Sequence, residues 1–193
     1  MKLILNSRGL NTKIGMSQFR KVIGGDELSE KRIFICSYPD YEIDDRILEN
    51  CMSLGFSEKS ICFSKSGIPE EPVSYVYITE GNTFEILNYM RKNNLCQYII
   101  DVCKAGAVYL GSSAGALLAG VDCKLALDFD SNYVGMRDFT GLGLLDGVVV
   151  PHYTRDQLKR YILESDDELI KSYKKIYNVD NDNVLILDSD RED

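Results

Sequence analysis

Seven short runs of apolar, often β-branched residues recur along this chain of 193 residues. Such runs are typical of strands that are buried on both faces of a parallel sheet. Stretches with the helical spacing of apolar residues separate several of them, and alternation of strands with helices predicts an α/β fold. We therefore expect three layers, a mostly parallel central sheet with helices on both faces. The expected strands are residues 3–5, 33–36, 61–63, 75–78, 107–110, 148–150 and 184–187.

Helical spacing of apolar residues is clearest at residues 43–51, 84–90, 99–103 and 158–170, and a short apolar helix is expected at residues 114–119. Residues 120–147 are rich in glycine and aspartate and lack such a pattern, which predicts a loop-rich excursion with room for a hairpin. No internal repeat is visible. The length suits one domain, so residues 1–193 are expected to form a single α/β unit.

The charge balance excludes some classes of protein. The chain carries 22 lysines and arginines against 30 aspartates and glutamates, a net charge of −8, whereas nucleic-acid binders usually present a basic stripe. No apolar stretch has the length of a membrane span, and the first residues lack the apolar region of a signal peptide. We expect a cytoplasmic protein with no nucleic-acid and no membrane partner.

The cysteines and the single histidine limit the metal chemistry. None of the six cysteines forms a CxxC pair, and several lie within apolar runs, so we expect reduced, mostly buried thiols. With only one histidine, a structural zinc site is not expected. The expectation is a protein with no metal and no organic cofactor.

The most informative motif is Gly-Ser-Ser-Ala-Gly-Ala at residues 111–116, which contains G-x-S-x-G. It follows an expected strand and precedes an apolar helical segment, which is the context of a nucleophile elbow. Ser113 is then the candidate nucleophile, with Ser112 as the rival, and the backbone N–H of Ala114 is a candidate oxyanion donor. The alternative is an ordinary strand-to-helix turn in which a serine caps the helix.

His152 follows another expected strand, in Val-Val-Val-Pro-His-Tyr at residues 148–153. The carboxyl ends of parallel strands line the ligand crevice of such sheets. Ser113 and His152 both come just after strand ends, so His152 is the candidate general base. A lone histidine is more often a surface or core residue, and that reading remains the alternative.

A third strand-to-helix turn lies at Glu-Gly-Asn-Thr-Phe, residues 80–84. Asn82 or Thr83 could simply cap the helix that begins near Phe84. The backbone N–H of Gly81 could instead donate to an oxyanion beside that of Ala114. The sequence leaves both interpretations open.

Together these motifs resemble the peptidase E family of serine peptidases, which includes α-aspartyl dipeptidase and is related to the cyanophycinases. The resemblance covers most of the chain and implies a flavodoxin-like fold similar to class I glutamine amidotransferase domains. It implies Ser113 as nucleophile, His152 as base, and the Gly81 and Ala114 backbones as oxyanion hole. A small peptide substrate is implied, with dipeptides that begin with aspartate as one option. The motifs are residues 80–84, 111–116, 141–144 and 151–153.

The oxyanion turn departs from the family pattern, because Glu80 stands where the family usually has glycine. Asn82 and Thr83, which keep that pattern, are the expected substrate-binding residues. This departure motivates an alternative function, a non-catalytic binding or regulatory protein on the same fold. A related amide or ester hydrolase is a further alternative, and a homodimer is allowed.

The acid that orients His152 is the second departure. The family's glutamate aligns near Ser189, so we expect Asp188 or Asp190 to supply the carboxylate, from a strand in the same sheet as residues 148–150. Asp130 and Asp128, in the loop after the nucleophile helix, are the second choice. Arg137 and Arg155 are candidates for recognising an acidic substrate side chain.

Overall fold

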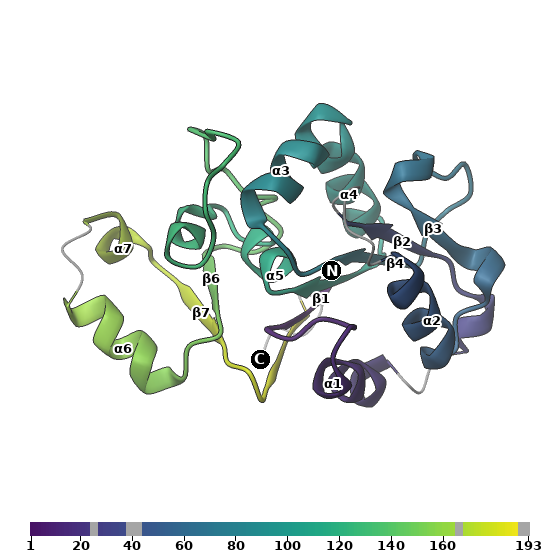
Figure 1. Cartoon of the computed structure of the whole chain (residues 1–193), viewed down its shortest axis with the longest axis horizontal. Helices are drawn as coiled ribbons and strands as arrows, with labels where there is room; N and C mark the ends of the chain where they lie inside the picture. The colour runs from purple at the N-terminus through teal and green to yellow at the C-terminus, as the bar shows by residue number, and fades with distance from the viewer. Residues whose placement is uncertain (24–26, 38–43, 165–167, 189–193) are drawn as a thin grey trace.

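The computed structural model of the chain describes residues 1–23, 27–37, 44–164 and 168–188, and the secondary structure within them alternates between strands and helices (Figure 1). The strands are β1 (Lys2–Asn6), β2 (Ile33–Cys36), β3 (Ile61–Phe63), β4 (Tyr75–Ile78), β5 (Val108–Ser112), β6 (Val148–Pro151), β7 (Ile176–Val179) and β8 (Val184–Asp188). The α-helices are α1 (Lys13–Ile23), α2 (Asp44–Leu54), α3 (Thr83–Lys92), α4 (Leu95–Lys104), α5 (Ala114–Leu118), α6 (Arg155–Glu164) and α7 (Glu168–Ser172). Short 3₁₀ helices lie at Leu28–Glu30, Glu58–Ser60, Ser64–Ser66 and Lys124–Asp128.

Six strands form the main sheet in the order β3-β2-β4-β5-β1-β8. All neighbours pair in parallel except β8, which runs antiparallel to β1 at one edge. The strands β6 and β7 pair in parallel with each other and form a separate two-stranded sheet. The carboxyl ends of β1, β4 and β5 therefore lie at one edge of the main sheet.

The main sheet is covered on both faces, as its uniformly apolar strands predict. Alternate residues of each strand enter two different core clusters, as Ile33 and Phe34 in β2 show. One cluster packs the sheet against α3 and α4, and the other packs it against α1 and α2, which lie on opposite faces (Figure 1). This arrangement confirms the expected three-layer fold with a mostly parallel sheet.

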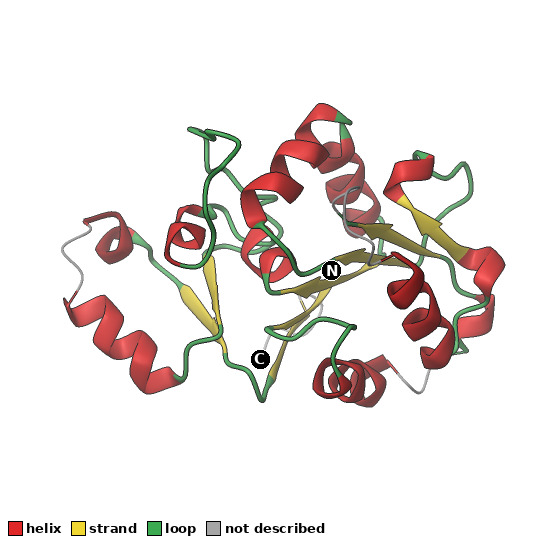
Figure 2. Cartoon of the chain, viewed as in Figure 1, coloured by secondary structure: helices red, strands yellow, loops and turns green. Residues whose placement is uncertain are grey.

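The helix α5 joins the two sheets. It contacts β5 of the main sheet and β6 of the small sheet, and its apolar residues share one core cluster with Val148, Val149 and Val150. Between α5 and β6 the chain is largely loop, as Figure 2 shows, with one isolated antiparallel bridge between Asp122 and Thr140. This matches the irregular excursion expected for residues 120–147.

Two expectations about the strands were wrong. The segment Ile176–Val179 forms β7, which the sequence patterns did not predict. We also expected residues 184–187 to lie in the same sheet as residues 148–150, but β8 pairs with β1 and β6 pairs with β7. Because β8 is antiparallel to β1, its carboxyl end lies at the edge of the sheet opposite to the end of β1.

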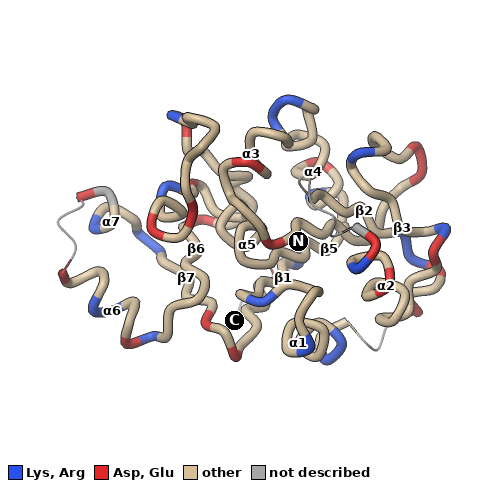
Figure 3. Tube along the Cα trace, in the orientation of Figure 1, with Lys and Arg blue, Asp and Glu red and all other residues tan. Residues whose placement is uncertain are grey.

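The helix α1 was also absent from the sequence prediction, because Gly15, Ser17 and Gln18 interrupt its apolar pattern. Along the described part of the Cα trace, lysine and arginine positions are interspersed with aspartate and glutamate positions (Figure 3). Among the described helices, none is long and apolar enough to span a bilayer.

Candidate active site

Ser113 occupies a strained turn between β5 and α5. Its φ of 49° and ψ of −104° lie outside the regions that non-glycine residues normally adopt. Such a conformation costs about 1–3 kcal/mol and persists only where the surroundings impose it. The Ser113 N–H donates to Asn6 O at 2.9 Å, and its carbonyl oxygen accepts from Leu117 N at 3.0 Å. The turn thus fixes the serine at the carboxyl edge of the main sheet.

The glycines of the G-x-S-x-G motif are required by close approach of the backbone. A Cβ on Gly115 would lie 2.2 Å from Ile78 O, and one on Gly111 would lie 2.6 Å from Gly115 O. The N–H of Gly115 also donates to Thr79 O at 3.2 Å, which ties the start of α5 to the end of β4. Small residues at these positions let α5 begin directly beneath the strand ends.

His152 follows β6 and points at the serine. Its Nε2 lies 2.9 Å from Ser113 Oγ. Its backbone is also fixed at a positive φ of 71°, and its N–H donates to Val179 O at 3.0 Å and to Ser7 Oγ at 2.9 Å. The Ser7 hydroxyl in turn donates to Val179 O, so the end of β1 is joined to the ends of β6 and β7. The structure therefore brings the predicted nucleophile and base within hydrogen-bonding distance.

The second ring nitrogen of His152 faces an amide rather than a carboxylate. Asn181 Oδ1 lies 3.2 Å from His152 Nδ1. If Nε2 accepts the Ser113 hydroxyl proton, Nδ1 must carry the ring hydrogen and donate it to Asn181. Asn181 comes two residues after β7, and its backbone carbonyl oxygen accepts from Arg8 Nε at 3.2 Å.

The turn that presents Asn181 is stabilised by its neighbour Asp180. The Asp180 carboxylate accepts from the N–H groups of Asp182 and Asn183 and from the Asn183 side chain, each at 2.9 Å. Burial opposes ionisation of Asp180, but these hydrogen bonds and the charge of Arg155 outweigh it, so the pKa of Asp180 lies below its ordinary value. The turn is thus held by an ionised side chain at neutral pH.

The acids expected from the sequence lie elsewhere. Asp130 Oδ2 accepts from Thr83 N at 2.9 Å and from Thr83 Oγ1 at 2.6 Å, and Asp128 accepts from the Tyr161 hydroxyl. Asp188 ends the antiparallel strand β8 opposite Lys2, at the edge of the sheet away from Ser113, because that strand runs against its neighbour. Asp190 lies outside the described residues.

The expected oxyanion donors follow β4 and β5. Gly81 has a φ of 142°, and neither its N–H nor that of Ala114 has a hydrogen-bond acceptor within the part of the chain that the structure describes. Asn82 Oδ1 caps α3 by accepting from Phe84 N and Glu85 N, and Asn82 Nδ2 donates to Ser131 O at 2.9 Å. The Asn82 side chain therefore caps α3 and contacts Ser131, and the Thr83 side chain contacts Asp130.

A cavity of about 410 Å³ opens beside Ser113 and His152. It contains one cationic and one anionic side chain, Arg8 and Glu80, and neither Asn82 nor Thr83 is among its lining residues. Sequence reasoning missed Arg8, although it follows the end of β1 much as Ser113 follows β5. The cavity is lined by Ser7, Arg8, Gly9, Thr12, Glu80, Ser113, His152 and Asn181.

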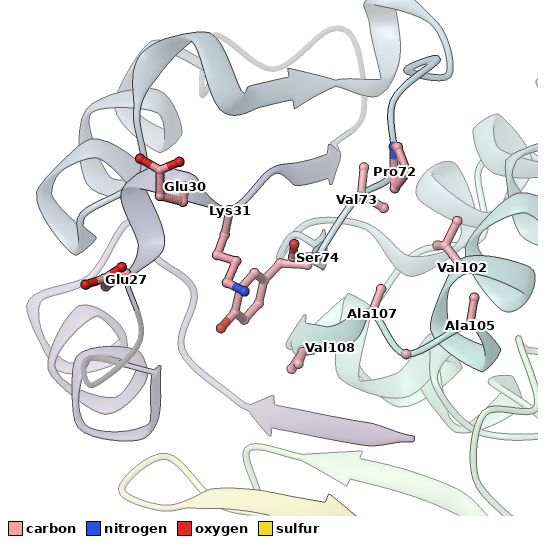
Figure 4. Close-up of a pocket in the computed structure, with 12 residues that line it drawn as sticks. Glu27, Glu30, Lys31, Pro72, Val73, Ser74, Val102, Ala105, Ala107 and Val108 are labelled. Carbon is pink, nitrogen blue, oxygen red and sulfur yellow. The ribbon is translucent and has the colours of Figure 1, made fainter.

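A larger cavity, of about 740 Å³, lies at the opposite edge of the sheet, where β2, β4 and β5 begin. In Figure 4, Glu30 and Lys31 lie on one wall, and Val102 and Ala107 lie on the other. The only histidine of the chain lies at the other edge, so this cavity cannot hold a serine–histidine pair. The serine–histidine pair lines the smaller cavity.

The described residues hold no group of three or more histidine, cysteine, aspartate or glutamate side chains that could bind a metal ion. All six cysteines are unpaired thiols, of which Cys62 and Cys96 are only half-buried. Burial raises the pKa of the other four thiols to about 12, so they stay protonated at neutral pH.

Comparison with known proteins identifies relatives of this chain. An uncharacterized peptidase of Pasteurella multocida is 30% identical over 120 residues, which are 60% of this chain and 56% of that protein. Peptidase E of Escherichia coli O1:K1 is 37% identical over 84 residues, which are 44% of this chain and 36% of that protein. The chain thus spans only about half the length, or less, of these relatives.

Solved structures share the fold over nearly the whole chain. A crystal structure of a candidate peptidase E protein from Listeria monocytogenes EGD-e superposes with a TM-score of 0.72 at 20% identity, covering 98% of this chain and 95% of that one. A peptidase from an acI-B1 Actinobacterium gives a TM-score of 0.63 at 16% identity, covering 96% and 82%. The model of peptidase family S51 matches residues 43–192, and the chain therefore belongs to peptidase family S51.

Proposed function

We propose that this protein is a serine peptidase that hydrolyses small peptides through an acyl-enzyme on Ser113. The observation that carries the proposal is the 2.9 Å contact between Ser113 Oγ and His152 Nε2, made by a serine on a strained strand-to-helix turn. Membership of peptidase family S51 supports the same reaction class. A nucleophile in contact with an oriented base is the arrangement that acyl transfer requires.

In the proposed reaction, Ser113 Oγ attacks the scissile carbonyl carbon while His152 Nε2 accepts the hydroxyl proton. The tetrahedral oxyanion is stabilised by the N–H groups of Gly81 and Ala114, which have no acceptor within the described structure. His152 then gives its proton to the leaving amine as the C–N bond breaks. Water, deprotonated by His152, then attacks the ester carbonyl of the acyl-enzyme. The bond between that carbon and Ser113 Oγ breaks, His152 returns the proton to Ser113 Oγ, and the carboxylic acid product leaves.

Asn181 is proposed as the third member of a Ser-His-Asn triad. Its Oδ1 at 3.2 Å from His152 Nδ1 can fix the tautomer that leaves Nε2 free to accept a proton. An asparagine serves this purpose in papain-like peptidases, where the nucleophile is cysteine. Being neutral, it orients the imidazole but stabilises the developing imidazolium less than a carboxylate does.

The size of the site favours small substrates. A cavity of about 410 Å³ accommodates a ligand of a few residues rather than a folded chain. Similarity to peptidase E makes dipeptides with an N-terminal aspartate one of the first substrates to test, and Arg8 is the cationic side chain in the cavity that could bind their carboxylates. A homodimer is an additional expectation, which light scattering of the purified protein can test.

A fluorophosphonate probe and a dipeptide library, applied to the wild type and to Ser113→Ala in parallel, test the proposal. We expect the wild type to be labelled at Ser113 and to cleave members of the library, and Ser113→Ala to do neither. A wild type that is folded, unlabelled and inactive on every peptide would instead identify a non-catalytic binding protein. Labelling without peptide cleavage would indicate a hydrolase for another amide or ester.

A further inference from the structure

Glu80 places a carboxylate in the candidate active site. The residue follows β4, and its side chain reaches the loop after β1, where its oxygens lie against Gly9. A Cβ on Gly9 would lie only 1.7 Å from Glu80 Oε2. The absence of a side chain at Gly9 therefore provides the space that the carboxylate occupies.

Two donors fix the orientation of this carboxylate. Asn11 Nδ2 donates to Glu80 Oε1 at 2.7 Å, and the Tyr77 hydroxyl donates to Glu80 Oε2 at 2.9 Å. Burial, together with the charge of Glu80, raises the pKa of Tyr77 well above its ordinary value, so the phenol stays protonated and can donate. Each carboxylate oxygen can accept more than one hydrogen bond, so Glu80 keeps capacity for a further donor.

The charge of Glu80 is not paired with a cation of the protein. No lysine or arginine in the described ranges lies within salt-bridge distance of it, and Arg8, the cationic residue of the same cavity, instead donates through Nε to Asn181 O. A fixed, unpaired carboxylate beside Ser113 would repel the oxyanion that forms during the proposed reaction. A positive charge on the bound substrate would remove that repulsion.

We propose that Glu80 is a specificity-determining residue, which binds a positively charged amino group of the substrate beside the scissile carbonyl. This inference rests on the proposed peptidase function. The ammonium donates to Glu80, in addition to the hydrogen bonds from Asn11 and Tyr77. The amino group can come from the free N-terminus of the peptide or from a lysine side chain, and both present the same hydrogen-bonding cation.

Glu80→Gln is a suitable test because the change is isosteric. The glutamine oxygen can still accept from Asn11 Nδ2, and its amide can donate to the oxygen of Tyr77. The Tyr77 hydroxyl can then turn to Ser112 Oγ, which lies 3.3 Å away. The matched control is Glu30→Gln, which removes the same charge at the opposite edge of the sheet.

The kinetic experiment compares kcat/KM for the best dipeptide of the library with that of its N-acetylated form. A second pair, N-acetyl-lysyl and N-acetyl-norleucyl peptides, tests the lysine side chain as the source of the amino group. For at least one of the two pairs, we expect the wild type and Glu30→Gln to hydrolyse the amino-bearing peptide with a kcat/KM about tenfold or more above that of its uncharged partner. This is the size of the effect of losing one hydrogen bond to a charged group. Glu80→Gln should reduce that preference about tenfold.

An unchanged preference in Glu80→Gln, with peptides still hydrolysed, would overturn the role of Glu80 and leave the proposed function intact. The role is also tested without turnover, by calorimetric titration of the same peptide pairs into Ser113→Ala and into Ser113→Ala combined with Glu80→Gln. Tighter binding of the amino-bearing form that disappears in the double variant supports the inference even if no peptide is hydrolysed. Equal affinities in both backgrounds would refute it.

Discussion

Replacing Asn181 with alanine should slow peptide hydrolysis only modestly. The change removes one neutral hydrogen bond, 3.2 Å long, from His152 Nδ1. Such a bond contributes about 0.5–1.5 kcal/mol, which corresponds to a roughly two- to tenfold loss of kcat. Removal of the orienting acid from a Ser-His-Asp triad costs about 10⁴ in kcat, so the size of the effect distinguishes an amide from a carboxylate.

Asn181→Asp is the complementary change. A carboxylate at the same distance would make a charge-assisted hydrogen bond, worth about 1.5–3 kcal/mol, to the imidazolium that forms in the transition state. We expect kcat to rise about threefold to tenfold at pH 8, where the carboxylate is ionised. The acid limb of the pH–rate profile should move to higher pH, because the new negative charge also stabilises imidazolium in the resting enzyme.

The assay is steady-state hydrolysis of one dipeptide from pH 5 to 9, with thermal unfolding of each variant as a check on folding. Asp182→Asn is the matched control, because Asp182 lies in the same turn with an exposed side chain and should leave kcat unchanged. The reasoning is refuted if Asn181→Ala retains full activity while Asp128→Asn, Asp130→Asn or Asp188→Asn slows turnover more than tenfold.

The remaining predictions concern the nucleophile, the pH profile, metal ions and the thiols. Ser113→Ala should lower kcat by at least about 10³-fold. Ser112→Ala removes buried hydrogen bonds with Asn6 and Tyr77, so it should stay within about tenfold of wild-type activity and lose about 1–3 kcal/mol of stability. The reverse pattern of activities would assign the nucleophile to Ser112. Activity should fall at acidic pH, because protonated His152 cannot accept a proton from Ser113, and a flat pH–rate profile in folded protein would contradict this. EDTA and reducing agents should not change the rate, and inhibition by EDTA that a divalent ion reverses would show that a metal is needed. The contribution of the buried thiols to stability should be constant below about pH 9 and should be lost as the pH rises toward 12, since the unfolded chain releases its thiol protons first. An unfolding temperature that stays constant from pH 8 to 11 would count against it. The thiols responsible have a pKa raised from 9.0 to about 12 and are Cys36, Cys51, Cys103 and Cys123.

The sequence was most informative where burial on both faces dictates composition. Strands such as Ile33–Cys36 and Tyr75–Ile78 must be apolar at every position, because neighbouring residues contact helices on opposite sides of the sheet. The contact between Ser113 and His152 could be anticipated for a related reason. Both follow parallel strands, whose carboxyl ends meet at one crevice, and the chain has no other histidine.

The residues that complete the cavity were harder to predict because local patterns do not encode strand direction. Glu80 was recognised as a departure from the family motif. Its contact with Asn11, however, joins two segments that are 69 residues apart in sequence, the loop after β1 and the turn after β4. Arg8 gave no signal beyond its place after β1. Such side chains become functional candidates only when the order of the strands in the sheet is known.

The proposed third member of the triad, Asn181, shows how one missed strand displaces a site assignment. The segment Ile176–Val179 follows two lysines and contains an asparagine, so it lacks the apolar run that marks the other strands. Because β7 was not predicted, residues 184–187 were expected to lie in the same sheet as residues 148–150, and the acid was sought after the carboxyl end of that strand. In the structure, Pro151 pairs with Val179 in parallel register, so the residues that follow these two positions leave the sheet at the same level. His152 and Asn181 are therefore brought together by the pairing of β6 with β7. The antiparallel direction of β8 places its first residue, Val184, beside Asn6 at the active-site edge and Asp188 at the other, so a residue after β8 would have to cross the sheet to reach the imidazole.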